Sequence, residues 1–201
     1  MINNALTDPF IQNRLIEYGY TSDRIQAGKV LYEIALTAFQ KQQADYGEQI
    51  SATATLKQTW DEAKVSYMRL IKITRVAFKG DAGTATRLGL NGRRKNTLAG
   101  WLLQAQQFYS NALSSPDLLT TLAKYGVTPT KLEAAQAEMH AVEVANQRQE
   151  KEKGEAQDAT QARDAAIASL NKWLSDFVAI ARIALEERPQ LLESLGILKP
   201  S

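Results

Sequence analysis

The stretch "YGYTSDRIQAG" at residues 18–28 returns in altered form as "YGVTPTKLEAA" at residues 125–135, which is 107 positions later. Without a gap, the same offset aligns 21 identical residues over the 86 positions from Asn4 to Gly89. Self-similarity at a fixed offset indicates an internal duplication. The sequence therefore predicts three parts: a first helical repeat at 1–94, a connecting helix at 95–114 and a second helical repeat at 115–201.

Both stretches combine a glycine that can end one helix with a threonine that can cap the next. Glycine adopts the left-handed conformation that follows the last turn of many helices, and threonine accepts hydrogen bonds from a helix N-terminus. The segments "RLGL" at 87–90 and "SLGI" at 194–197 repeat the glycine stop. We therefore expect helix ends with positive φ at Gly19, Gly89, Gly126 and Gly196.

Between these corners, apolar and small residues recur at intervals of three and four. One such series is Ile25, Gly28, Tyr32, Ala35, Phe39, Gln42 and Tyr46. This spacing is typical of helices that pack along a seam, and no stretch has the period of two that a strand needs. Gly47 and Gly154 are interpreted as hairpin tips, so that each repeat reads as short, long, long and short helix. The predicted fold is all-α: an elongated, coiled-coil-like helical bundle formed by a tandem duplication of this unit.

The connecting helix at Asn96–Leu113 has almost no counterpart in the first repeat, where only Asn4-Ala5-Leu6 corresponds to it. We expect the surface that such a helix would cover to be apolar and open in the first repeat. Exposed apolar patches commonly mark interfaces. The sequence thus predicts a homo-oligomer, most simply a twofold dimer, which uses this surface or the first tip with Tyr46 and Ile50.

The composition narrows the class of protein. Hydrophobic residues make up 44% of the chain, the formal net charge is only +2, and there is no cysteine. Disulfides and thiolate metal sites are therefore excluded, and a reducing compartment is expected. No apolar run approaches the roughly 20 residues of a membrane span, and the first residues lack a signal-peptide pattern. We expect a bacterial, cytoplasmic protein that does not enter a membrane.

The search for reactive groups nominates no catalytic, cofactor-binding or metal-binding residue. His140 is the only histidine, whereas a carboxylate di-iron bundle uses two Glu-x-x-His motifs. No phosphate loop, Gly-x-Ser-x-Gly elbow or Ser-His-Asp triad is recognisable. Aromatic residues at helical spacing are expected in the core: Trp60, Tyr67, Trp101, Phe108, Tyr109, Trp173 and Phe177.

Positive charge is concentrated in one part of the first repeat. Residues 64–95 hold nine basic side chains and one acid, Asp81. The candidate residues for binding an anionic partner are Lys64, Lys72, Arg75, Lys79, Arg87, Arg93, Arg94 and Lys95. The alternative interpretation is a solvated helix face. Arg75 is matched by Arg182 in the second repeat, which suggests a structural role for that arginine.

Three functions remain open. The sequence favours a non-enzymatic structural or interaction protein that self-associates. The first alternative is a protein that binds nucleic acid or another anionic partner through the basic residues, with little sequence preference because no base-reading motif is present. The second alternative is a bundle that binds a small ligand or catalyses a reaction.

Overall fold

The computed structural model describes residues 1–198, and these form helices and connecting segments without a strand. The helices are α1 (Ile2–Thr7), α2 (Pro9–Glu17), α3 (Ser22–Ala77), α4 (Ala82–Arg87), α5 (Leu98–Leu113), α6 (Pro116–Ala123), α7 (Pro129–Ala184) and α8 (Gln190–Ser194). The prediction of an all-α fold is confirmed.

The two longest helices have the same length and matching positions in the two repeats. Helices α3 and α7 each contain 56 residues, and both their first and their last residues differ by 107 positions. The shorter helices follow nearly the same offset, since α2 corresponds to α6 and α4 to α8. The sequence offset is thus also an offset between helix boundaries.

The predicted hairpin tips are wrong. Gly47 and Gly154 lie inside α3 and α7, so each repeat has one long helix where two were expected. A turn at glycine generally needs positive φ, and neither residue has it. A single glycine costs a helix only about 1 kcal/mol relative to alanine. The neighbouring glutamates, glutamines, lysines and alanines are good helix formers that offset this cost.

The expected glycine corners are confirmed. Gly19, Gly89, Gly126 and Gly196 all have φ between 62° and 79°. After each of them, the next backbone N–H donates to a carbonyl five residues earlier, as in a Schellman motif. Tyr20 donates to Leu15, and Val127 donates to Leu122 in the equivalent position of the second repeat. The residues that follow the four glycines are all buried: Tyr20, Leu90, Val127 and Ile197.

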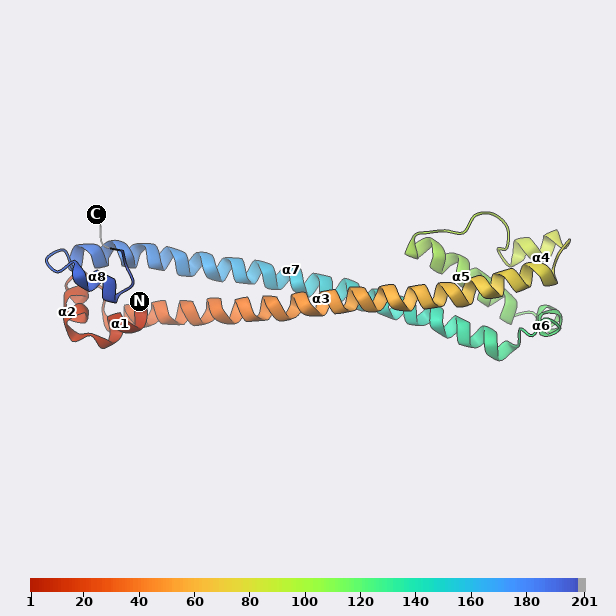
Figure 1. The fold of residues 1–201 in the computed structure, drawn as a ribbon, viewed down its shortest axis with the longest axis horizontal. Helices are drawn as coiled ribbons and strands as arrows, with labels where there is room; N and C mark the ends of the chain where they lie inside the picture. Colours follow the sequence, from red (N-terminus) through yellow and green to blue (C-terminus); the bar gives the residue numbers. More distant parts are fainter. Residues whose placement is uncertain (199–201) are drawn as a thin grey trace. The chain divides into compact units, whose positions relative to one another are not determined.

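The chain forms two compact units, and each contains parts of both repeats. Unit 1 comprises Met1–Gly47 and Gly154–Ser201, and unit 2 comprises Glu48–Lys153. Unit 1 therefore holds α1, α2 and α8 with the first half of α3 and the second half of α7. Unit 2 holds α4, α5 and α6 with the second half of α3 and the first half of α7 (Figure 1).

Unit 1 has an aromatic core where α3 and α7 run antiparallel. The ring of Tyr20 lies edge-on to Trp173 and Phe177, and these two rings stack on each other at 5.0 Å. Gly28 of α3 also faces the indole of Trp173. Along this contact the residue numbers rise from Tyr20 to Gly28 on one side and fall from Phe177 to Trp173 on the other. The two helix segments therefore run in opposite directions (Figure 1).

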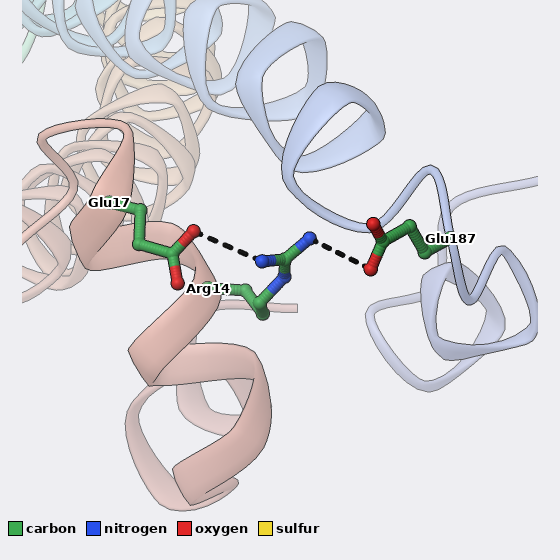
Figure 2. A network of polar contacts seen from close by, with 3 residues as sticks. All are labelled: Arg14, Glu17 and Glu187. Atoms are coloured by element: carbon green, nitrogen blue, oxygen red, sulfur yellow. Dashed lines mark hydrogen bonds and ion pairs between the residues drawn. The ribbon is translucent and has the colours of Figure 1, made fainter.

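A polar contact also joins the two repeats inside unit 1. Arg14 of α2 lies between Glu17, at 3.0 Å, and Glu187, at 3.2 Å, as Figure 2 shows. Glu187 belongs to the segment between α7 and α8. Glu17 and Glu187 are well exposed, so this network contributes little free energy.

Unit 2 has the larger aromatic cluster. The ring of Tyr67 on α3 lies edge-on to Trp101, Phe108 and Tyr109 of α5, with centroids 5.9–6.1 Å apart. The prediction that the seven aromatic residues form core is confirmed, since five are buried and Trp60 and Trp173 are partly buried. Helix α5 therefore supplies a large share of this core.

Candidate functional site

The most unusual surface of unit 1 is an apolar row on α3. Tyr32, Leu36, Phe39 and Tyr46 follow one another at steps of four, three and seven residues. Steps of this kind place the four side chains on one face of a helix. Each is between 42% and 54% exposed. We call these four residues the α3 row.

The α3 row corrects part of the predicted seam. Tyr32, Phe39 and Tyr46 were expected to pack inside the bundle, yet the buried residues of this segment are Ile25, Gly28 and Ala35. All of these residues belong to the one predicted series, of which only a part is buried. Tyr32, Phe39 and Tyr46 remain on the surface of unit 1.

Residues of α7 continue this apolar surface. Ile167 is exposed, and Leu170 and Leu174 are partly buried. Together with Tyr32 and the residues at the start of α1, Leu170 and Leu174 line an open pocket of about 470 Å³. Its polar edge is formed by Lys29 and Glu33 on α3 and by Asn3 and Asn4 on α1. Tyr32 is the residue of the α3 row that lines this pocket, and we call the pocket, Ile167 and the rest of the α3 row together the groove of unit 1.

In unit 2 the equivalent place is occupied by α5. The positions that correspond to Ile167, Leu170 and Leu174 are Trp60, Ala63 and Tyr67, and the position that corresponds to Tyr32 is Met139. These four residues belong to one hydrophobic cluster with Trp101, Ala105 and Phe108 of α5. Trp101 lies 6.2 Å from Trp60 and 6.0 Å from Tyr67 between ring centroids.

The same comparison shows which part of α5 is represented in unit 1. Residues 109–114 correspond to 2–7, so α1 matches the last turns of α5. Within residues 1–198, unit 1 has no helix at the place that corresponds to Trp101 and Ala105 of unit 2. Tyr32, whose equivalent Met139 lies in the cluster with α5, is 51% exposed, which agrees with the expectation of an open apolar surface there.

Tyr46 and Ile50, the residues predicted for self-association, lie four residues apart in the middle of α3 and are both 54% exposed. The tip on which they were expected to stand does not exist. Tyr46 is nevertheless part of the α3 row, and Ile50 follows it at the next helical step.

Leu36 was not nominated from the sequence, although a signal was present. The equivalents of Leu36, Phe39 and Tyr46 in the second repeat are Glu143, Asn146 and Lys153. Where a position is apolar in the first repeat and polar in the second, the apolar side chain can belong to a surface that is buried against a partner only in the first repeat. Comparison of the copies position by position would have identified the row.

The predicted basic residues divide into two groups, all in unit 2. Three of them make internal contacts. Arg75 donates two hydrogen bonds to the carbonyl of Leu90, at 3.1 and 2.7 Å. Lys64 pairs with Asp61 at 2.7 Å and lies over the ring of Trp60.

Arg94 is the third of these internally engaged residues. It donates to the hydroxyl of Tyr67 at 3.0 Å and to the carbonyls of Gly89 and Asn91 at 2.8 Å. The loop that precedes α5 is therefore tied to the core of unit 2 by a guanidinium. A structural role is thus visible for Arg75, as expected, and for Arg94.

The remaining predicted basic side chains are exposed: Lys72, Lys79, Arg87, Arg93 and Lys95. They lie on the last turns of α3, in the turn between α3 and α4, on α4 and in the segment before α5. Their charges are therefore presented to solvent by four consecutive parts of unit 2.

Other polar features carry no recognisable reactive centre. Nδ1 of His140 lies 2.8 Å from Oε2 of Glu143, and the histidine side chain is well exposed. Within residues 1–198, no group of three or more histidine, aspartate or glutamate side chains is placed to hold a metal ion. No described helix has both the length and the apolar character of a bilayer span.

Comparisons of this chain with protein-family models, with curated proteins and with solved structures found no match.

Proposed function

We propose that this chain is a helical interaction protein, without a catalytic role, that associates with a second copy of itself through unit 1. The observation that carries the proposal is the α3 row. Four large apolar side chains at coiled-coil spacing lie on one helix face, and each is about half exposed. Burying the exposed half of such a side chain against a partner is favourable by roughly 0.8–1.5 kcal/mol.

The polar counterpart in the second repeat supports this interpretation. Glu143, Asn146 and Lys153 would resist burial because polar and charged side chains are costly to remove from water. The two copies share their helix boundaries but differ in this row. An apolar row that is exposed in one copy and replaced by polar residues in the other fits a role in association better than a role in folding.

Sedimentation equilibrium of the purified chain tests the proposal. We expect a dimer at micromolar concentration, and we expect the double variant Leu36→Glu/Phe39→Glu to be monomeric with unchanged helical content. The control is Val65→Glu/Val144→Glu, which places the same charges at two even more exposed valines of unit 2 and should leave the dimer intact. A wild-type chain that sediments as a monomer would overturn the proposal.

A second candidate function rests on a different observation, the exposure of five of the predicted basic residues: Lys72, Lys79, Arg87, Arg93 and Lys95. Lysine and arginine side chains on neighbouring segments can bind a phosphate backbone or an acidic protein, with an affinity that falls as salt rises. We expect retention on heparin at low salt, lost in the variant Lys72→Gln/Lys79→Gln/Arg93→Gln. Because Arg75 and Arg94 stay intact, this variant should keep its stability. Flow-through of the wild type at low salt would contradict this candidate.

A further inference from the structure

We infer that α3 of the second copy occupies the groove of unit 1, in the place that α5 occupies in unit 2, and runs antiparallel to the first α3. This inference rests on the proposed self-association and adds the element, its direction and its register. In this arrangement Leu36 of each copy packs against Phe39 of the other, and a twofold axis passes between them.

The first argument is that the protein already contains a filled version of this groove. In unit 2, a helix with large apolar residues packs against the equivalents of Ile167, Leu170 and Leu174. Residues of the same kind, tyrosine, leucine and phenylalanine, lie on the α3 row. A helix that presents this row therefore matches the groove in the type of side chain that it offers.

The second argument is the direction of α5. Trp101 approaches Trp60, whereas Tyr109 approaches Tyr67, so α5 and the second half of α3 run in the same direction. Helix α5 also shares a hydrophobic cluster with Met139 and Val142 of α7, on a helix segment that runs in the opposite direction to that part of α3. The first half of α3 is the equivalent of this α7 segment. A helix that bound the unit 1 groove in the orientation of α5 would therefore run antiparallel to the first half of α3. A twofold axis perpendicular to α3 generates this direction for the α3 of a second copy.

The third argument concerns register. In unit 2, the residues of α7 that share a hydrophobic cluster with α5 are Leu132, Ala135, Met139 and Val142. The equivalent of Met139 in α3 is Tyr32, and Leu36 and Phe39 follow Tyr32 on the same helix face. Antiparallel packing sets unlike seam positions opposite each other, and of the pairings that this allows, Leu36 with Phe39 lies nearest the middle of the α3 row. The same register places Tyr32 opposite Gln43.

Cysteine cross-linking tests the register, because the natural chain has no cysteine. Two single variants, Leu36→Cys and Phe39→Cys, carry different affinity tags and are mixed in equal amounts under mild oxidation. The control mixture contains Val65→Cys and Val144→Cys, which lie on exposed positions of unit 2. Helical content and sedimentation of each variant are recorded first, so that a variant that fails to fold or to associate is recognised.

We expect the Leu36→Cys/Phe39→Cys mixture to form a doubly tagged disulfide dimer roughly a hundredfold faster than the control mixture. The reason is that a bound partner presents its thiol at millimolar effective concentration, whereas free chains meet at micromolar concentration. A sedimenting dimer in which this mixture cross-links no faster than the control overturns the inference but leaves self-association standing. A monomeric wild type overturns both.

A synthetic peptide of residues 96–113 tests a different occupant. Equal binding of the peptide to the wild type and to the monomeric Leu36→Glu/Phe39→Glu variant would show that the groove accepts a helix without contacts to Leu36 and Phe39. The inferred register would then be wrong. We expect it instead to compete weakly with the dimer and not to bind the variant, because both require Leu36 and Phe39.

Discussion

The indole of Trp173 packs directly on Gly28 of α3, where a Cβ atom would overlap the ring. The indole cannot easily move away, because it stacks on Phe177 and contacts Tyr20 edge-on. Ile25 and Ala35 on the same face of α3 are buried as well. The closest approach of α3 and α7 in unit 1 therefore depends on the absence of a side chain at residue 28.

We predict that Gly28→Ala lowers the free energy of unfolding by about 1–2 kcal/mol. Overpacking a core typically costs 1–3 kcal/mol, and the better helix propensity of alanine returns up to about 1 kcal/mol. The matched control is Gly154→Ala, which adds a Cβ in open space within α7 and should stabilise the protein by about 0.5–1 kcal/mol. Urea unfolding of the three proteins measures the difference, and stabilisation by both substitutions would show that Trp173 is free to shift.

The continuity of α3 through Gly47 gives a second prediction. Proline inside a helix removes a hydrogen bond and clashes with the preceding turn, at a cost of about 3 kcal/mol or more. We therefore expect Gly47→Pro to lower the urea midpoint and to reduce helical circular dichroism, whereas Gly47→Ala preserves both. A fully tolerated proline would instead be the behaviour of a turn between two helices.

Alkaline pH should destabilise unit 2 through its buried tyrosines. Burial raises the pKa of Tyr109 far above its usual value near 10, and the charges of Glu138 and Tyr67 add to this effect. Burial likewise raises the pKa of Tyr67, although Arg94 opposes the shift. Since the folded state holds both phenols neutral, their contribution to stability is fully present below pH 10 and is lost as pH rises above it.

The expected slope above pH 10 is as much as about 1.4 kcal/mol per pH unit for each such tyrosine. Urea unfolding between pH 8 and 11, a range chosen around the ordinary tyrosine pKa of about 10, measures this slope. Tyr109→Phe should make it shallower, whereas Tyr46→Phe, at an exposed position, should leave it unchanged. Equal slopes for the wild type and Tyr109→Phe would contradict the prediction.

Two adjacent arginines should behave differently. Arg94→Gln removes a guanidinium that bonds to Tyr67, Gly89 and Asn91, and we expect a loss of about 1.5–3 kcal/mol of stability. Arg93→Gln changes an exposed side chain and should shift stability by no more than about 0.5 kcal/mol. Thermal unfolding decides between them. If the two variants are equally stable, Arg94 does not hold the loop before α5.

The amino-acid sequence alone determined the local features of this protein. Glycine at residues 19, 89, 126 and 196 is the residue that most readily adopts positive φ, so these helix ends could be recognised from single residues and their neighbours. The repeat offset and the apolar periodicity gave the all-α fold for the same reason: the spacing of three and four is a property of one helix, independent of its partner.

Only the tertiary structure decided which residues of the apolar series are buried and where the long helices end. Tyr32, Ala35 and Phe39 belong to one series with regular spacing, yet Ala35 is buried and Tyr32 and Phe39 are exposed, because burial depends on where a second helix packs. A lone glycine such as Gly47 is compatible with a turn or with a helix, because its cost of about 1 kcal/mol is small beside that of the packing around it. The open groove follows from the same cause: its walls come from α3 and α7, residues more than 120 positions apart, and such a juxtaposition arises only when the two repeats fold together.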